Sequence, residues 1–504
     1  MRASHRSGAS RRSLTVAWLT LVIVFGVPLA ALGDWTQFQG GPTHAGLADG
    51  PSAPLEVAWH SSDIAIDDAD VTGGLSAPIV AEDGTIVVVG PNEVLAFDGE
   101  DRSEVFSAER DLGPSVPAAI GEGADGPIVV FAEGFGGRGP SSTASPAVSD
   151  AGTPTASPST GPGSTSEESD GPDSHLAAVD LRTGELAWPA PVQLDDVVRT
   201  PIAADESAAY VGDISGHVKA VELSSGDVRW SADLGSSIAG AVTVDGDRAV
   251  VATVGAQQTP GVVAVLDRST GEELWRTGED AISGNLVSAP IVADGRVVLL
   301  EQSAIVALDD SDGRLLWRTE IVNPLRTPFS PEAIAAMAPL SADGWVFAAD
   351  TTGRVYGLDA ETGAIRWDQA LNDPSPLTPP LLIDEHLLVP ANSGELYVVD
   401  RRTGRLAFRV DAGASFLRGL ADAGDVLVAV TGVADAGIVA FGEDPDGVLT
   451  DELSPTTFDV GRFLAGFALG ALPLAVVVLG LARPVQRRLG STPRPAADPE
   501  EAPG

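Results

Sequence analysis

The chain of 504 residues contains no cysteine, a single lysine (Lys219) and only two methionines. Without cysteine it forms no disulfide and offers no thiolate to a metal or to catalysis. Basic residues are also scarce, because 30 Lys and Arg face 71 Asp and Glu, which gives a formal net charge of −41. Such a charge repels polyanions, so we expect no nucleic-acid partner. With 44% hydrophobic residues, a large core can supply the stability.

A short unit recurs along the chain: an acid is followed by a turn, and an aromatic residue stands eight positions after the acid. The clearest copy reads Asp-Leu-Arg-Thr-Gly-Glu-Leu-Ala-Trp at 180–188. The pairs are Asp98 and Phe106, Asp180 and Trp188, Glu222 and Trp230, Asp267 and Trp275, Asp309 and Trp317, Asp359 and Trp367, and Asp400 and Phe408. From Asp180 onward the acids are 42, 45, 42, 50 and 41 residues apart. Four-stranded repeats of ~40–45 residues are typical of propeller blades.

Counting the two halves of the repeat gives the number of blades. Eight segments contain the upstream strands of a unit, but no aromatic strand follows the last of them. That strand is present at the other end of the chain, as Leu-Glu-Val-Ala-Trp at 55–59. We therefore predict an all-β, eight-bladed propeller over residues 34–450, with four-stranded blades and a last blade completed by the strand of Trp59. Closure of this kind removes the open sheet edges between the first and last blades.

The repeat residues have structural explanations. The acid can accept hydrogen bonds from the turn after it, and Gly adopts the positive φ that the turn needs. The Trp can fill the wedge between adjacent blades, although stacking on a ligand is an alternative role. Trp345 stands outside the motif and could face a ligand. Arg199 and Arg418 precede two predicted inner strands, where they could capture a carboxylate or phosphate in the central funnel or form salt bridges to the abundant acids.

The two ends of the chain indicate export and membrane attachment. Residues 1–33 carry four Arg before an apolar run that ends in small residues, as a signal peptide does. Residues 463–481 contain no charge and approach the ~20 residues that span a bilayer. Arg483, Arg487 and Arg488 follow, so the positive-inside rule predicts a cytoplasmic tail over 482–504. We expect a single-pass cell-membrane protein with its propeller outside the cytoplasm; whether the signal is cleaved stays open.

An insert separates the two halves of one blade. Residues 136–174 are rich in Ser, Thr, Pro and Gly, and they predict a disordered surface loop. The insert explains why Asp98 and Asp180 are 82 residues apart, since removing its 39 residues leaves 43, one ordinary blade. The six His (5, 44, 60, 175, 217 and 386) are scattered without the spacing of metal ligands, and no Ser/His/Asp set can be argued. The sequence therefore predicts no metal site and no catalytic residue.

The motif Asp-x-x-Thr-Gly-x-x-x-Trp, together with the opening Asp-Trp-Thr-Gln-Phe-Gln-Gly-Gly-Pro-Thr-His-Ala-Gly at 34–46, resembles the pyrroloquinoline-quinone-repeat (PQQ-like) eight-bladed propellers. The resemblance covers roughly residues 34–442. This superfamily contains quinoprotein dehydrogenases and also non-catalytic members, such as the lipoprotein of the outer-membrane β-barrel assembly machine. Its enzymes share a vicinal Cys-Cys disulfide, a Trp against the quinone, a Ca²⁺ held by Glu, Asn and Asp, and a catalytic Asp.

This chain departs from the enzyme pattern. It has no cysteine, and no set of residues matches the Ca²⁺ ligands or the catalytic Asp. The resemblance thus favours a non-catalytic member without a cofactor, which acts as a binding or scaffolding module for an envelope protein or a small-molecule ligand. A PQQ- and Ca-dependent quinoprotein dehydrogenase is the alternative, and an envelope sensor is a third reading.

Overall fold

The computed structural model describes residues 35–61, 74–134, 174–255, 260–278, 281–283, 286, 288–301, 303–321, 338–350, 353–371, 378–414, 417–432, 437–445 and 447. The predicted signal peptide, membrane span and cytoplasmic tail lie outside these residues. In the part of the chain that is described, no helix has the length and apolar character needed to cross a membrane. The predicted insert also lies outside them except for its last residue. That residue, Ser174, is buried.

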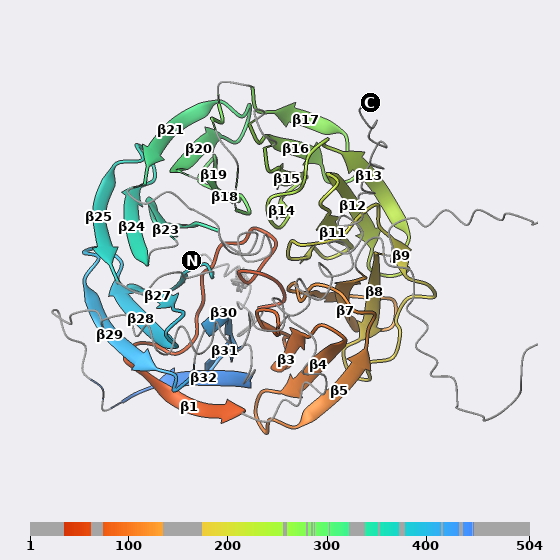
Figure 1. Cartoon of the computed structure of the whole chain (residues 1–504), viewed down its shortest axis with the longest axis horizontal. Coiled ribbons are helices and arrows are strands. Elements are labelled where there is room, and N and C mark those ends of the chain that lie inside the picture. The colour runs from red at the N-terminus through yellow and green to blue at the C-terminus, as the bar shows by residue number, and fades with distance from the viewer. Residues whose placement is uncertain are drawn as a thin grey trace, which may run out of the picture.

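Eight four-stranded antiparallel sheets form a closed ring (Figure 1), which confirms the predicted propeller. Blades 1 and 2 contain β2 (Ile79–Val80), β3 (Thr85–Val89), β4 (Glu93–Asp98), β5 (Glu104–Glu109), β6 (Ala119–Glu122), β7 (Pro127–Glu133), β8 (His175–Asp180) and β9 (Val192–Gln193). Blades 3 and 4 contain β10 (Ala203–Ala204), β11 (Ala208–Gly212), β12 (His217–Glu222), β13 (Val228–Asp233), β14 (Thr243–Asp245), β15 (Arg248–Ala252), β16 (Val263–Asp267) and β17 (Glu273–Arg276).

The second half of the ring has the same plan. Blades 5 and 6 contain β18 (Ile291–Ala293), β19 (Arg296–Glu301), β20 (Ala304–Asp309), β21 (Leu315–Glu320), β22 (Leu340–Ala342), β23 (Trp345–Ala349), β24 (Arg354–Asp359) and β25 (Ile365–Ala370). Blades 7 and 8 contain β26 (Leu381–Ile383), β27 (His386–Pro390), β28 (Glu395–Asp400), β29 (Leu406–Asp411), β30 (Leu417–Asp422), β31 (Leu427–Thr431), β32 (Gly437–Glu443) and β1 (Leu55–Ser61). In blade 8 the N-terminal strand β1 pairs with β32, from Leu55 opposite Glu443 to Ser61 opposite Ile438, so the predicted closure is confirmed.

The up-and-down order of the strands gives the ring two different faces. One face carries the turns between the first and second strands and between the third and fourth strands of each blade; we call it the turn face. The opposite face carries the loops between the second and third strands and the connections from one blade to the next; we call it the connector face. The first strand of each blade lines the centre and the fourth strand forms the outer rim (Figure 1).

The acids of the repeat lie at the turn face, where the side chain of each Asp accepts N–H groups of the turn that follows it, whereas Glu222 pairs with Arg229. Asp180 Oδ1 accepts hydrogen bonds from the backbone N–H groups of Arg182 and Thr183, both at 3.0 Å. Asp400 Oδ1 likewise accepts from the N–H groups of Arg402 and Thr403, at 3.1 and 2.7 Å. The Gly of these turns has positive φ, for example +70° at Gly184 and Gly404. A residue with a β-carbon is strained in this conformation, which explains the Gly.

The aromatic residues of the repeat pack between blades. The indole N–H of Trp188 donates to the carbonyl of Leu223 in the next blade at 2.8 Å. In every such pair the acceptor is the residue directly after the next blade's acid, as for Trp230 with Arg268, Trp275 with Asp310, Trp317 with Ala360, and Trp367 with Arg401. The ring also covers the turn Gly of that blade, which leaves no room for a β-carbon. Hydrophobic clusters accordingly draw residues from two neighbouring blades, so the core lies between them.

Blade 2 departs from the repeat in one respect. Trp188 is buried between blades, but the outermost strand begins only at Val192, four residues later. Pro189 and Pro191 follow Trp188, and proline has no N–H for the ladder. The pairing of β8 with the outermost strand is therefore interrupted. Val179 pairs with Leu186 in an isolated bridge, and regular pairing resumes where Leu176 lies opposite Val192.

Residues 35–48 cross the centre of the ring near the turn face (Figure 1) and join the inner strands of several blades. The side chain of Gln37 both accepts from the N–H and donates to the carbonyl of Ala204, at 2.9 and 2.7 Å. His44 is fully buried, with Nδ1 2.8 Å from the carbonyl of Phe38 and Nε2 3.0 Å from the carbonyl of Val242. Burial lowers the pKa of His44. The opening of the chain that resembles the PQQ-like family is therefore a plug of the central channel.

Candidate functional site

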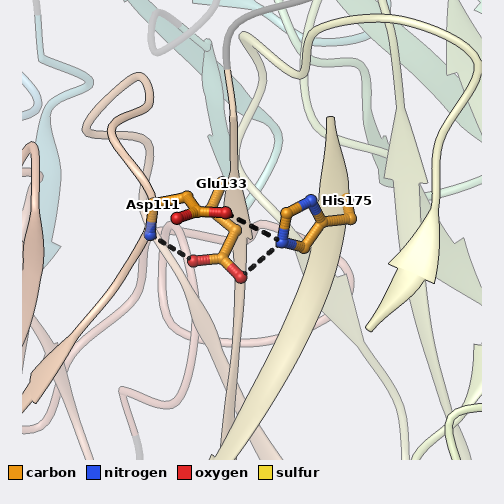
Figure 2. Close-up of side chains that lie close together, drawn as sticks. All are labelled: Asp111, Glu133 and His175. Atoms are coloured by element: carbon orange, nitrogen blue, oxygen red, sulfur yellow. Dashed lines mark hydrogen bonds and ion pairs between the residues drawn. The ribbon is translucent and has the colours of Figure 1, made fainter. Parts of the chain in front are cut away.

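The connector face brings together a histidine and two carboxylates at the base of the predicted insert (Figure 2). Glu133 ends β7 and His175 begins β8, and the two residues lie directly opposite each other in the sheet. Asp111 lies in the connection from blade 1, two residues after the end of β5. His175 Nε2 is 2.7 Å from Glu133 Oε1 and 3.7 Å from Asp111 Oδ2. Three residues that are 22 and 42 positions apart in sequence thus form one cluster, which we call the blade 2 cluster.

Most of the blade 2 cluster is removed from water. His175 and Glu133 are 7% and 8% exposed, whereas the side chain of Asp111 is 71% exposed. The backbone N–H of Asp111 donates to Glu133 Oε2 at 2.8 Å, which leaves Oε1 turned to the imidazole. Buried charges are costly unless they are paired, so this carboxylate and this imidazole stabilise each other. The side of the cluster formed by Asp111 remains open to solvent.

Arg110 lies beside the blade 2 cluster and is itself 7% exposed. Its Nε donates to the carbonyl of Asp111 at 3.3 Å and its Nη2 to the carbonyl of Pro114 at 3.1 Å. Burial lowers the pKa of Arg110 to about 10, although the negative charges of Glu133 and Asp111 act to raise it. The guanidinium therefore stays charged at neutral pH. A β-carbon at Gly113 would lie 2.6 Å from Arg110 Nη2 and 3.2 Å from the Cα of Glu133, so only Gly fits between them.

A second cluster occupies the same place one blade further on. Asp195 lies two residues after β9, Asp213 follows β11, and His217 begins β12. Here the carboxylates already have hydrogen-bond donors. The ammonium of Lys219 donates to Asp195. Asp213 Oδ1 accepts from the backbone N–H groups of Ser215, Gly216 and His217 at 2.9–3.0 Å. The hydrogen bond from Lys219 lowers the pKa of Asp195. These are the two groups of His and carboxylates that the described residues place within reach of one ion.

The three residues predicted to bind a ligand do not come together. Trp345 begins β23 beside the motif acid Asp359, at the turn face. Arg199 is half-buried beside the bridge of Val198 with Asp213, at the connector face. Arg418 lies inside β30 opposite Val430, so the prediction that it precedes the inner strand is wrong. The Trp and the two Arg belong to opposite ends of their blades, and ligand binding by any of them stays a prediction.

Sequence reasoning missed the blade 2 cluster because the insert separates Glu133 from His175. The signal lies in the alignment of the blades: an acid at the end of the second strand and a His at the start of the third recur in blade 3 as Asp213 and His217. Aligning the whole repeats, including the second and third strands and not only the segment from acid to aromatic, would have matched Glu133 with Asp213 and His175 with His217.

The outer rim exposes aliphatic side chains that directly follow carboxylates. Four consecutive blades each expose one aliphatic side chain one or two positions before the motif aromatic, with a carboxylate directly before it in the chain. The pairs are Glu104 and Val105, Glu185 and Leu186, Asp227 and Val228, and Glu273 and Leu274. On the described rim of blades 5–8, the one large aliphatic side chain exposed at this place is Ile365, and Ala364, not a carboxylate, stands before it. We call the four pairs the acidic–aliphatic arc.

Comparison with known proteins is consistent with this architecture. Residues 172–327 and 301–450, together more than half of the chain, match the family described as outer membrane protein assembly factor BamB. The BamB of Yersinia pestis is 24% identical over 298 residues, which cover 53% of this chain and 71% of that protein. The crystal structure of BamB from Moraxella catarrhalis superimposes with a TM-score of 0.52 at 15% identity, covering 77% of this chain and 99% of that one. At this identity the structural likeness concerns the fold alone.

A quinoprotein is also similar over a shorter stretch. The quinohemoprotein alcohol dehydrogenase ADH-IIG of Pseudomonas putida is 31% identical over 122 residues, which cover 21% of this chain and 17% of that enzyme.

Proposed function

The chain belongs to the family described as outer membrane protein assembly factor BamB, and from this premise we propose that it is a non-catalytic β-propeller of the cell envelope that binds a protein partner. The predicted signal at 1–33 and span at 463–481 support a propeller held at the outer side of the cell membrane, with the tail at 482–504 in the cytoplasm. A rigid ring suits this role, because binding energy is not lost in ordering the scaffold.

The observation that carries the proposal is the acidic–aliphatic arc. Isolated apolar residues on a surface need no explanation. Here one is exposed on each of four neighbouring blades, and we take this recurrence as the sign of an interaction surface. Leu186 and Val228 are 74% and 45% exposed and lie on adjacent blades. A complementary partner presents apolar side chains flanked by Lys or Arg, because each aliphatic group of the arc has a carboxylate before it. Such a contact weakens as salt rises, since exposed charges are screened.

In-cell crosslinking of the full-length protein, followed by mass spectrometry, tests the proposal. We compare wild type with the double variant L186S/V228S, and use I365S as the matched control. Ile365 stands at the same repeat position, two before the Trp, and is 41% exposed. We expect one envelope protein to be recovered with wild type and I365S and to be lost with L186S/V228S. Equal recovery with all three variants would place the contact elsewhere, and recovery of the chain alone would refute the proposal.

A quinoprotein dehydrogenase is the second candidate, supported by the similarity to the Pseudomonas putida enzyme. The residues do not fit the quinone site that the family implies. Trp345, the free candidate for the quinone face, stacks on Phe347 with ring centroids 5.8 Å apart and has the guanidinium of Arg366 4.5 Å from its ring centroid. The chain also lacks the cysteine pair. We therefore propose no quinone cofactor. Dye-linked alcohol oxidation by the full-length protein with added PQQ and Ca²⁺ checks this, and turnover would reinstate the enzyme.

A further inference from the structure

We propose that His175 Nε2, Glu133 and Asp111 bind one first-row divalent cation of the Zn²⁺ type at the base of the connection between β7 and β8. This site is independent of partner binding on the rim. The cation would join both ends of the predicted insert to the connection from blade 1, because Glu133 precedes the insert, His175 follows it, and Asp111 comes from the neighbouring blade (Figure 2).

The donor atoms fit such an ion in kind and in spacing. One imidazole nitrogen and two carboxylates are ligands that Zn²⁺ accepts, whereas Ca²⁺ and Mg²⁺ prefer oxygen alone. Bonds of ~2.0–2.1 Å in a tetrahedral arrangement put ligand atoms about 3.3 Å apart. The two distances from His175 Nε2, 2.7 Å to Glu133 Oε1 and 3.7 Å to Asp111 Oδ2, lie on either side of this value. All three donor atoms lie within 4.8 Å of one another.

The ligands are held in place before an ion arrives. Glu133 and His175 are fixed opposite each other by the sheet, and the N–H of Asp111 holds one oxygen of Glu133 so that the other faces His175 Nε2. An ion bound between these two atoms would replace their direct contact. Orientation of this kind by outer hydrogen bonds raises metal affinity. The solvent-exposed side of Asp111 leaves a fourth coordination position open to water.

Arg110 sets the charge beside the blade 2 cluster. It is buried beside the cluster, and among the described residues it forms no ion pair with either carboxylate, since its Nε and Nη2 donate to backbone carbonyls. Its Nη1 is buried without a hydrogen-bond partner in the described structure. A buried donor without an acceptor is costly, so a water or anion at this place would be favourable. The guanidinium is itself a cation and repels a divalent ion, and the carboxylates of Glu133 and Asp111 offset that repulsion.

The fold itself does not require this set of residues. In blade 4 the two positions that correspond to Glu133 and His175 carry Thr253 and Val262. In blade 3 Lys219 competes for Asp195, and the turn occupies Asp213. The blade 3 cluster is therefore a matched control in the same molecule, with similar residues that are not available to an ion.

Zn²⁺ titration of the tag-free, full-length protein against a chromophoric chelator tests the proposal, and the absence of cysteine removes thiolate background. We expect one Zn²⁺ per chain. Loss of an outer partner of a ligand costs ~10–100-fold in affinity, so H175Q, which removes a ligand, should weaken binding by at least about 100-fold. D111N changes an exposed side chain and should lower affinity without endangering the fold. H217Q, in the blade 3 cluster, should bind as wild type does.

A visible spectrum with Co²⁺ in place of Zn²⁺ reports the coordination, and its d–d bands should be lost in H175Q and D111N and kept in H217Q. Absence of stoichiometric Zn²⁺ binding by wild type would overturn the proposal. Binding that is unchanged in both H175Q and D111N, or that is lost in H217Q, would overturn it equally.

Discussion

On the turn face, Asp180 and Asp400 each accept hydrogen bonds from backbone N–H groups two and three residues further along the chain. On the connector face, Glu133 accepts from a residue of another blade and pairs with a His that lies beyond the insert. The turn-face arrangement recurs around the ring, whereas among the described residues the pairing of Glu133 with His175 belongs to blade 2. The difference shows that the turn face is fixed by the repeat, whereas the connector face and the rim differ from blade to blade and can carry function.

The largest expected effect concerns the aromatic residues of the repeat. Trp367 is buried between blades and donates to the carbonyl of Arg401 at 2.9 Å. Its replacement by Ala should lower the free energy of unfolding by about 3–5 kcal/mol, as for other buried Trp. Chemical denaturation measures the loss. Trp59 is half-buried in the closing blade, and W59A should cost less. Equal losses of unfolding free energy in W367A and W59A would contradict the role of the repeat Trp in packing between blades.

The turn glycines separate two causes of strain. Gly363 and Gly295 both have positive φ, +70° and +74°. A β-carbon at Gly363 would lie 2.5 Å from the ring of Trp317, whereas one at Gly295 would meet nothing within 4 Å. G295A should therefore cost about 1–2 kcal/mol, the strain of the left-handed conformation alone. G363A should cost clearly more, and the difference between the two denaturation curves gives the part due to the inter-blade contact. Identical losses would contradict the packing role of this Gly.

The acids of the turn face predict the direction of the pH dependence. The hydrogen bond from Arg366 lowers the pKa of Asp359, and that from Ser311 lowers the pKa of Asp309. Because the folded pKa lies below the unfolded one, this stabilisation is complete above about pH 4 and is lost as pH falls further. Urea midpoints between pH 6 and pH 2.5 should fall, and the fall should be shallower in D309N/D359N. An equally steep fall in this double variant would show that other groups control acid unfolding.

The rim should give the smallest effect on stability. Leu186 and Val228 are exposed, and surface substitutions of this kind usually change the free energy of unfolding by no more than about ±0.5 kcal/mol. L186S/V228S and I365S should therefore unfold within that range of wild type. A loss above about 2 kcal/mol in L186S/V228S would show that the arc belongs to the scaffold and not to a binding surface.

The turn face could be predicted because its causes are local. Acid, Gly and aromatic stand within nine residues of one another, so the blades, their number and the closing strand of Trp59 followed from the sequence. The prediction that Arg418 precedes its inner strand was wrong, because β30 begins one residue earlier, at Leu417. This error does not change the ring.

The candidate site could not be found in the same way. Asp111 and Glu133 approach each other only because a connection from blade 1 passes over the end of β7, and the insert hides the pairing of Glu133 with His175. The sequence showed the segment that forms the plug but not its contacts, because Gln37 and Ala204 are 167 residues apart in the chain. Contacts of this kind depend on closing the ring, which no short motif encodes.

A photo-crosslinking amino acid placed at Leu186 and, in a separate variant, at Ile365 of the full-length protein in cells tests most directly whether partner binding is confined to one side of the ring. The two positions are equivalent in the repeat, and both are exposed. We predict a covalent adduct with one envelope protein from position 186 and none from position 365. Adducts of equal yield from both positions, or from position 365 alone, would contradict the claim that function is confined to one side of a ring built by a uniform repeat.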